Sequence, residues 1–283
     1  LAPFYLVLTA LKVCCLALRR WRGPNRRYLK PLTGSRGVSV IIPHHDDLEM
    51  LQECLASVSE ASRQVSEPVE VLVVANGADA ARYAELERQF PSVRWSFFPI
   101  LLEFAGAIRC GLENARFDWV YLLNDDMVVD RLALGEVLKC RSSFTFAVAS
   151  QILVYHSGQP REETGYTFYR VVNGIIELDH RIPSEPALSE RILYAGGGSS
   201  LFHRVRLIEF MGTRDPYSPC YFEDAEWSVL AWKHGYEVIV CPESQVRHRH
   251  RVTHQQLFGS REINRIFERN ACRFQLRNAL HGG

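Results

Sequence analysis

The segment VSVIIPHHDDLEMLQECLASV, residues 38–58, changes from one hydrophobic periodicity to another within a few positions. Its first six residues form a mostly apolar, β-branched run that ends at proline, which is typical of a strand buried in a parallel sheet. Apolar residues then recur at helical spacing from Leu48 to Val58. The segment VEVLVVANG, residues 69–77, is a second such strand that ends in a turn signal. Strand, helix and strand within about forty residues predict a βαβ unit.

The same alternation continues along the chain. Residues 81–90 and 105–115 have helical patterns, while residues 93–98 and 119–126 are typical of strands. This alternation predicts an α/β fold with a mostly parallel sheet and helices on both faces. Ligands of such sheets bind beyond the carboxyl ends of the strands. We therefore expect the loops that follow three strands to surround one mouth: residues 44–47, 75–79 and 124–126.

The second half of the chain has a less regular pattern. FTFAVASQILVY, residues 144–155, predicts a strand, and TFYRVVNGIIELDH, residues 167–180, predicts a hairpin that turns at its Asn-Gly pair. GGGSSLF, residues 196–202, predicts a flexible turn that leads into apolar structure. EDAEWSVLAWKHGY, residues 223–236, predicts a helix that begins with two acids and ends at glycine, just before another strand.

Length and composition indicate a folded globular protein. The chain has 283 residues, of which 47% are hydrophobic, enough for a sizeable core. Its net charge of +1 is unevenly spread: the first 45 residues carry eight positive charges and residues 247–283 a net six, so the body between them carries −13. Eight scattered cysteines favour a reducing compartment. Because the acidic body would repel a phosphate backbone, we expect no nucleic-acid partner.

The N-terminal segment predicts a membrane anchor. Residues 1–18 are predominantly apolar, with Lys12 as their single charge, and a central Lys costs about 2.5–3.5 kcal/mol on insertion scales. The alternatives are a signal peptide and a packed amphipathic helix. A basic linker, residues 19–37, follows the apolar run, and by the positive-inside tendency it places the next domain in the cytoplasm. We therefore expect a membrane-associated protein whose main domain, residues 38–250, is cytoplasmic.

The C-terminal residues 251–283 predict a basic amphipathic helix. Arginines recur at every fourth position, and apolar side chains occupy another side of the same helix. These arginines are Arg261, Arg265, Arg269, Arg273 and Arg277. Such a helix can lie on an anionic membrane surface, close over the mouth of the sheet, or pack on the body of the protein.

Three polar residues follow the apolar part of the strand at 119–126 and are candidates for metal binding. Asn124, Asp125 and Asp126 could simply form a turn, because Asn and Asp favour turns. At the carboxyl end of a central strand, however, Asp126 would face the ligand crevice. Mg²⁺ takes carboxylate oxygens and completes its shell with waters and substrate phosphates. One or two carboxylates would therefore be enough.

Two further groups of polar residues could carry chemistry. Glu223 and Asp224 open a predicted helix, where acids are stabilised by the helix dipole and by capping. The same dipole would keep Asp224 ionised at neutral pH, which suits a carboxylate that accepts a proton. Downstream, His248, His250 and His254 form either a basic surface or a set of metal ligands. Of these, His248 is the best placed, just beyond a predicted strand.

The order of these segments resembles that of the family 2 glycosyltransferases, which have the GT-A fold, over residues 38–250. Six features of this chain are similar to features of that family. They are, in chain order, an opening strand with its Pro-x-x-Asn type turn, a second strand, a helix, an Asp-x-Asp type motif, an acceptor-side turn and a Glu-Asp helix. In this chain they are VSVIIPHHDD, VLVVANGAD, FAGAIRCGLENA, LLNDD, GGGSSLFHR and FEDAEWSVLAWKHGYEVIVCPESQVRH. The FAGA and LLN patterns are most similar to rhamnosyltransferase-like members.

The resemblance implies transfer of a sugar from a nucleotide-diphosphate donor to an acceptor hydroxyl, with inversion at the anomeric carbon. Asp126, with Asn124, would bind a divalent metal, Mg²⁺ or Mn²⁺, on the diphosphate, and His248 would complete its shell. Asp224 would be the general base, with Glu223 beside it. Contacts to the nucleotide sugar would come from Pro43, His44, Asp46, Asn76, Gly106, Arg109 and Asp125.

This chain departs from the family pattern at two positions. Ala75 stands where many members have an Asp that contacts the nucleobase, and Asp46 stands where Asn is usual. A degenerate protein that binds a nucleotide or a glycan without turnover is therefore an alternative. A nucleotidyltransferase on a related sheet is another, but PHHDD has neither the Gly-rich loop nor the basic residue that this class needs after the first strand.

The two basic ends and the resemblance together indicate where the acceptor would be found. An anchor and an arginine helix would hold the acidic body against a membrane surface. We therefore expect a glycan or lipid-linked acceptor, in the synthesis of cell-surface polysaccharide or glycolipid.

Overall fold

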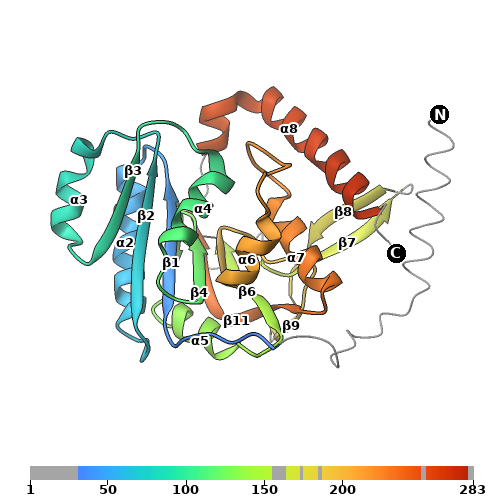
Figure 1. Cartoon of the computed structure of the whole chain (residues 1–283), viewed down its shortest axis with the longest axis horizontal. Helices are drawn as coiled ribbons and strands as arrows, with labels where there is room; N and C mark the ends of the chain where they lie inside the picture. The colour runs from blue at the N-terminus through green and yellow to red at the C-terminus, as the bar shows by residue number, and fades with distance from the viewer. Residues whose placement is uncertain (1–30, 155–163, 173–174, 184–186, 250–252, 280–283) are drawn as a thin grey trace.

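A mixed nine-stranded sheet lies at the centre of the molecule, with helices on both faces (Figure 1). The computed structural model describes residues 31–154, 164–172, 175–183, 187–249 and 253–279. The strands lie in the order β3-β2-β1-β4-β10-β6-β11-β5, and β9 pairs with β11. Their bounds are β1 Val38–His44, β2 Val69–Asn76, β3 Val93–Phe98, β4 Trp119–Leu123, β5 Met127–Val129, β6 Thr145–Val154, β9 Glu190–Arg191, β10 Ser199–His203 and β11 Glu237–His248.

Strands β1 to β4 form a parallel block, as the sequence predicts. β1 pairs in parallel with β2 and with β4, and β2 pairs in parallel with β3. Val40, Ile41 and Ile42 are fully buried, because helices cover both faces of this part of the sheet. VSVIIP is therefore the doubly buried strand that its pattern predicts.

The other half of the sheet is mixed, so the expectation of a mostly parallel sheet is wrong there. β10 runs antiparallel to both β4 and β6, and β5 and β9 run antiparallel to β11. β6 and β11 are parallel to each other. The chain enters β10 directly from the glycine turn at residues 196–198, without the crossover helix that a parallel neighbour of β4 would need.

Two apolar layers cover the sheet. On one face, α2 and α5 pack against side chains such as Val40 and Ile42. On the other face, α4, α6 and α7 pack against Ile41 and Leu122, because successive side chains of a strand point to opposite faces. The helices are α2 Leu48–Ser62, the short 3₁₀ helix η2 Ala80–Tyr83, α3 Ala84–Gln89, α4 Glu103–Asn114, α5 Ala133–Lys139, α6 Arg204–Met211, α7 Glu223–Lys233 and α8 Thr253–Ala279.

The predicted hairpin and the C-terminal helix α8 lie together. β7, Thr167–Val172, pairs antiparallel with β8, Ile175–His180. Figure 1 shows α8 reaching across the molecule to this hairpin. The Gln275 side chain donates to the Ile176 carbonyl at 2.5 Å, and Phe274 is buried in a cluster with Tyr217. Of the three placements open to this helix, α8 therefore packs on the body of the protein.

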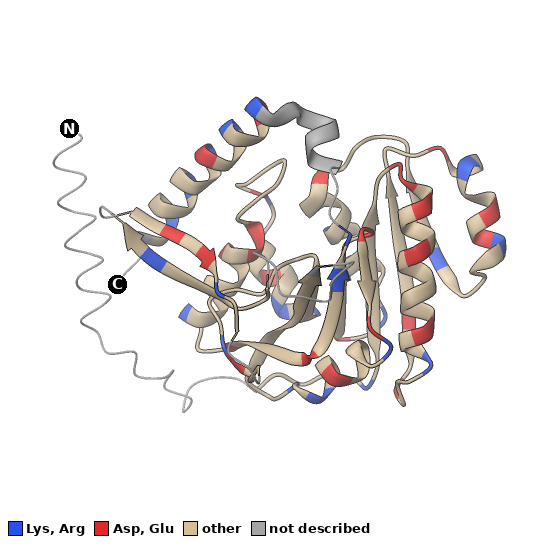
Figure 2. Cartoon of the chain, turned by 180° about the vertical axis from the view of Figure 1, so that it is seen from behind, with Lys and Arg blue, Asp and Glu red and all other residues tan. Residues whose placement is uncertain are grey.

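The predicted membrane anchor at residues 1–18, and the basic linker up to residue 30, lie outside the described residues. Within the described ranges, no helix is both long enough and apolar enough to cross a bilayer. In Figure 2 the ribbon of α2 is red at several acidic positions, and the ribbon of α8 is blue at several basic positions. The charge separation of the sequence is therefore in part a separation in space.

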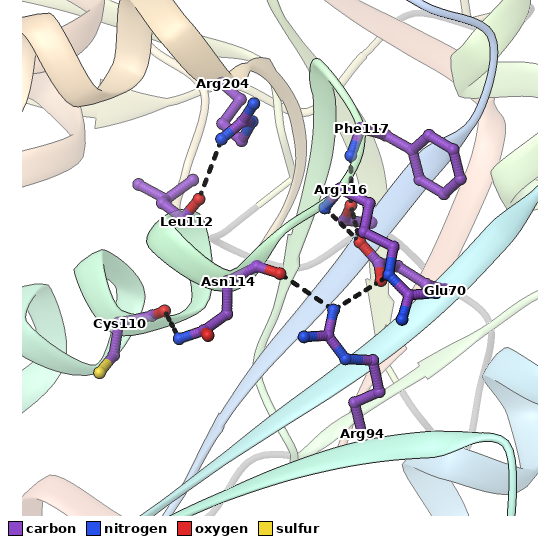
Figure 3. Close-up of polar contacts among 9 residues, drawn as sticks. Glu70, Arg94, Cys110, Leu112, Asn114, Arg116, Phe117 and Arg204 are labelled. Atoms are coloured by element: carbon purple, nitrogen blue, oxygen red, sulfur yellow. Dashed lines mark hydrogen bonds and ion pairs between the residues drawn. The ribbon is translucent and has the colours of Figure 1, made fainter.

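At the amino ends of the strands, one buried carboxylate ties several segments together (Figure 3). Glu70, at the start of β2, is 9% exposed. It accepts hydrogen bonds from the Ser39 hydroxyl at 2.6 Å, the Arg116 backbone N–H at 2.5 Å and the Arg94 guanidinium at 2.9 Å. Because its charge is satisfied by these partners, Glu70 stabilises this edge, while the opposite edge is the one at which ligands of such sheets bind.

Candidate active site

The turn between β4 and β5 places Asn124, Asp125 and Asp126 at the carboxyl end of a central strand. The Asn124 backbone N–H donates to the Gly198 carbonyl at 2.8 Å. The Asp126 carbonyl accepts from the Arg249 backbone N–H at 2.9 Å. The turn is thus tied to the segment before β10 on one side and to the end of β11 on the other, which fixes the directions of its three side chains.

Asp125 points into the protein and pairs with His44. Its Oδ2 lies 2.6 Å from His44 Nδ1, and the two residues are 8% and 2% exposed. Burial raises the pKa of Asp125, and the bond to His44 opposes that rise. His44 Nε2 is also buried and has no hydrogen-bond partner among the described residues. The middle residue of the acidic turn therefore belongs to the floor of the mouth and does not face water.

Asp126 and His248 meet across the sheet. β11 pairs with β5 so that His248 lies opposite Met127, and Asp126 Oδ2 is 2.9 Å from His248 Nε2. Asp126 Oδ1 is buried, and no described residue bonds it. A carboxylate oxygen and an imidazole nitrogen both bind divalent cations, and a cation would satisfy the orphaned oxygen. The site therefore fits a metal that takes few protein ligands.

The other predicted histidines do not extend this pair. Residue 250 lies outside the described residues, and the side chain of residue 254 lies outside the described side chains. In the described part of the chain, no three His, Cys, Asp or Glu side chains converge on one metal position. Further ligands of a cation held by Asp126 and His248 would therefore be Asn124, water or substrate phosphates.

Three consecutive glycines, residues 196–198, lie in space between the turn at residues 124–126, here called the acidic turn, and the first turn of α7. We call these glycines the glycine strip. A Cβ on Gly196 would lie 3.8 Å from Asp224 Oδ2, and a Cβ on Gly198 would lie 2.9 Å from Asn124 Nδ2. A Cβ on the middle glycine would lie 3.1 Å from the Phe104 ring. At Gly198 the strip lets a side chain approach the backbone more closely than a Cβ permits, and at Gly197 the approach is closer than most Cβ contacts.

Glu223 and Asp224 begin α7, as the sequence predicts. Asp224 Oδ2 accepts the Gly197 N–H at 3.0 Å, and Oδ1 accepts the Ala225 N–H at 2.8 Å. Glu223 is 5% exposed, and its buried Oε2 has no partner among the described residues. Burial raises the pKa of both carboxyls, more strongly for Glu223, where the charge of Asp224 adds to the effect.

Opposing effects act on the pKa of Asp224. The helix dipole predicts a lowered pKa for an acid in the first turn. In the structure the pKa of Asp224 is raised, because desolvation by burial outweighs the backbone hydrogen bonds that lower it.

Four non-glycine residues with positive φ border the mouth. Asp46 follows β1, Glu103 begins α4, and Tyr221 and Phe222 directly precede α7, with φ between 59° and 78°. Such conformations cost about 1–3 kcal/mol each and cluster at functional sites. They occur at the ends of the elements that supply the candidate residues, which supports a functional role for this edge.

Three of the predicted donor-binding residues lie around β1 and β2. Asn76 is buried, and its Oδ1 accepts the Leu102 N–H, which fixes the loop before α4. Pro43 is half-buried within β1. The Asp46 side chain is 67% exposed and pairs with Arg82 at 2.6 Å. The structure therefore places Asp46 at the outer margin of the mouth.

Gly106 and Arg109 line a cleft of about 410 Å³ between α4 and the loop that follows α6. The Arg109 guanidinium donates to the Gly212 carbonyl at 2.6 Å, so it is engaged with that loop. The other lining residues are Leu102, Glu103, Ala105, Thr213, Arg214, Asp215 and Ser218. Leu102, one of these residues, donates its backbone N–H to the Asn76 side chain, so this cleft adjoins the mouth.

Two features of the site were not predictable from motifs. The sequence indicates only a flexible turn at residues 196–202, and it does not indicate that His44 and Asp125 form a buried pair. One signal for the strip is present: three glycines directly precede a strand, β10, whose five residues are all buried. Glycines in such a place often mark a close approach of another group to the backbone.

Comparisons with known proteins identify the architecture. Residues 35–265 match the family described as "Glycosyltransferase like family 2". Among solved structures, GalNAc-T7 with UDP, GalNAc and Mn²⁺ has a TM-score of 0.58 at 18% identity, covering 80% of this chain and 45% of that one. No sequence among the curated proteins matches the chain.

Two further structures have the same architecture. The mannosyltransferase PcManGT of Pyrobaculum calidifontis, with GDP-Man and Mn²⁺, has a TM-score of 0.55 at 17% identity, covering 88% of this chain and 68% of that one. TarS 1–349 of S. aureus has a TM-score of 0.52 at 15% identity, covering 74% and 59%. The chain thus spans about half the length of the first neighbour, and at these identities the likeness shows the GT-A-like fold alone.

Proposed function

This chain belongs to glycosyltransferase-like family 2, and from that membership we propose that it transfers a sugar from a nucleotide-diphosphate donor to an acceptor hydroxyl with inversion. The observation that carries the proposal is the glycine strip, which has Asp224 at one end and Asn124 at the other. A proton acceptor and a diphosphate-binding turn so placed can act on two sides of one bound sugar.

Asp224 is the proposed general base. The acceptor oxygen forms a bond to the anomeric carbon on the face opposite the diphosphate, whose bond breaks with its electron pair, and the hydroxyl proton passes to Asp224. A raised pKa makes Asp224 a better match for this proton than an ordinary Asp, and two backbone N–H groups hold its orientation. Glu223, with the more strongly raised pKa, keeps its proton to higher pH, so the negative charge lies on Asp224.

Asp126 and His248, with Asn124, are the proposed ligands of Mg²⁺ or Mn²⁺. Their support is the orphaned Asp126 Oδ1 and its neighbouring imidazole. When bound, the cation would stabilise, as a Lewis acid, the negative charge that develops on the leaving nucleoside diphosphate. The GalNAc-T7 and PcManGT structures were both solved with Mn²⁺, which is consistent with this assignment.

The nucleotide sugar is proposed to lie over the buried floor of the mouth. His44, Asp125 and Asn76 form this floor, and each is less than one tenth exposed. Pro43 would support the floor from within β1. Asp46 lies at one margin of the mouth, and Gly106 and Arg109 lie along the adjoining cleft.

A membrane-associated location, with the catalytic domain in the cytoplasm and a glycan or lipid-linked acceptor, remains a proposal based on the sequence of residues 1–37. Synthesis of cell-surface polysaccharide or glycolipid would suit that location. The basic helix α8 supports a membrane location less than its sequence suggests, because three of its five regularly spaced arginines donate hydrogen bonds to the body of the protein. These are Arg269, Arg273 and Arg277.

The deciding experiment measures nucleotide release from a panel of nucleotide sugars, rhamnosyl donors included, with and without Mn²⁺ or Mg²⁺. We expect metal-dependent release from at least one donor, and Asp224→Asn should lower its rate by about 10²- to 10⁴-fold while donor binding persists. Asp118→Asn is the matched control, because Asp118 also accepts a backbone N–H but lies before the amino end of β4. A folded protein that binds a donor without any release would instead be a nucleotide-binding protein.

A further inference from the structure

The inner side of α8 contacts a loop that leads into the candidate active site. Residues 215–222 belong to the connection from α6 to α7, and α8 passes over this connection (Figure 1). The Arg269 guanidinium donates to the Ser218 carbonyl, and the Arg273 guanidinium donates to the Pro216 carbonyl at 2.8 Å. Some of the basic positions coloured blue along α8 in Figure 2 therefore hold this loop.

Asn270 is the centre of this contact. It is fully buried, and its Nδ2 donates to the carbonyls of Tyr217 at 2.5 Å and Cys220 at 2.7 Å. The Tyr221 carbonyl lies 3.3 Å from the same nitrogen. One side-chain amide thus gathers three carbonyls of the loop, a role that an isosteric carboxylate could not fill because it has no N–H to donate.

A second contact joins α8 to α7 itself. Glu226, two residues after Asp224, is 5% exposed. Its carboxylate accepts from Asn278 at 2.6 Å, from Arg277 at 3.0 Å and from the Tyr217 hydroxyl at 2.9 Å. Both α7 and the loop before it are therefore anchored to the same C-terminal helix.

The two strained residues before α7 are also held by α8. Tyr221 and Phe222 both have positive φ. The Phe222 ring packs against Phe267 and Phe274 at centroid distances of 5.1 and 5.6 Å, and the Tyr221 ring lies 5.9 Å from Phe267. Strained backbone persists only where its surroundings determine it, and here α8 supplies those surroundings.

We propose that Asn270 is a positioning residue for Asp224, and that α8 fixes the loop at residues 215–222 so that α7 presents its first turn to the mouth in one orientation. This inference rests on the proposed function of Asp224 as the base. Asn270 touches neither substrate, and its effect passes through the loop to the first turn of α7.

The test uses two variants of the full chain. Asn270→Asp changes the buried centre of the contact between α8 and the loop, and Arg269→Gln is a milder change on the exposed side of the same contact. Exposed Arg265, which bonds none of the described residues, gives the matched control Arg265→Gln. Nucleotide release is measured from the donor found in the panel, with water or added acceptor. We expect kcat to fall by about 10- to 100-fold for Asn270→Asp, and less for Arg269→Gln, at unchanged donor KM, because misplacement of the base affects the chemical step.

Amide hydrogen exchange is the second readout and does not depend on turnover. Residues 215–228 should exchange faster in Asn270→Asp and Arg269→Gln, while β1 and β2 keep their protection. Wild-type kcat in both variants, or a rise in donor KM equal to the loss of kcat/KM, would overturn the inference and leave the proposed function intact. If the wild type releases no nucleotide from any donor, the proposed function fails. Unchanged exchange at residues 215–228 would then overturn this inference as well.

Discussion

Gly198→Ala adds a single methyl group where the glycine strip meets the acidic turn. An ideal Cβ at this position would lie 2.9 Å from Asn124 Nδ2, 3.2 Å from Asn124 Cγ and 3.5 Å from Met127 Cε. The nearest atoms belong to the end of a side chain, so the Asn124 amide moves before any backbone does. Restoring a 3.4 Å contact requires a shift of about 0.5 Å, which is the tolerance of a preorganised site.

A displacement of 1 Å at such a site can cost about 100-fold in rate, so a shift of half that size should lower kcat/KM by about tenfold. That factor corresponds to about 1.4 kcal/mol of transition-state stabilisation. Folding stability should change little, because the lower conformational entropy of the unfolded Ala chain, about 0.4–1 kcal/mol, offsets part of the new strain.

The measurement is metal-dependent nucleotide release for Gly198→Ala, alone and combined with Asn124→Ala. Gly135→Ala is the control: a Cβ there meets nothing within 4 Å, and the site is inside α5, so stability should rise by about 0.5–1 kcal/mol with activity unchanged. If the methyl group acts by moving Asn124, its effect should disappear in the Asn124→Ala background. A tenfold loss that persists there, or wild-type activity in the single variant, would refute the reasoning about the strip.

Three other outcomes follow from the buried carboxylates. The pKa of Glu223 in the folded protein is raised well above 4.5, so the unfolded chain loses this proton first, and the stability of wild type falls as pH rises from the unfolded towards the folded pKa. Glu223→Gln should therefore gain more thermal stability over wild type at pH 8 than at pH 5. An equal gain at both pH values would contradict this. The acidic limb of kcat/KM should lie above the 3.8 of an ordinary Asp, because burial raises the pKa of Asp224 and the base must be ionised; a limb at or below 3.8 would argue against Asp224 as the base. Glu70→Gln should lower the free energy of unfolding by about 2 kcal/mol, since the amide cannot accept all the bonds from Ser39, Arg94 and the backbone, yet nucleotide release from the folded protein should not change.

The first half of the fold was predictable because its information is local. Each of β1, β2 and β4 is a short apolar run, and α2 has apolar residues at helical spacing from Leu48 to Val58. In each case the local pattern alone indicates which residues are buried. The direction of β10 was not predictable, because it depends on where a short glycine turn delivers the chain relative to β4 and β6.

The site was predictable only in part, for a similar reason. Position at a strand end singled out Asp126, but only the family resemblance joined it to His248, 122 residues away, because the pair forms through the register of β5 and β11. The burial that raises the pKa of Asp224 depends on packing that no local pattern reports. The arginine spacing of α8 likewise showed a basic band but not that this band would bind loop carbonyls.

The four positive-φ residues around the mouth have a consequence for how this protein can change. At about 1–3 kcal/mol each, their combined strain is a large fraction of the free energy of unfolding of a typical domain, which is about 5–15 kcal/mol. Glycine at position 46 or 103 would relieve part of that strain without removing the aromatic packing that Tyr221 and Phe222 make with α8. Selection for heat resistance alone should therefore favour glycine at these two positions. Retention of side chains at these positions in heat-resistant variants would indicate that activity, and not stability, limits which sequences can occupy the rim.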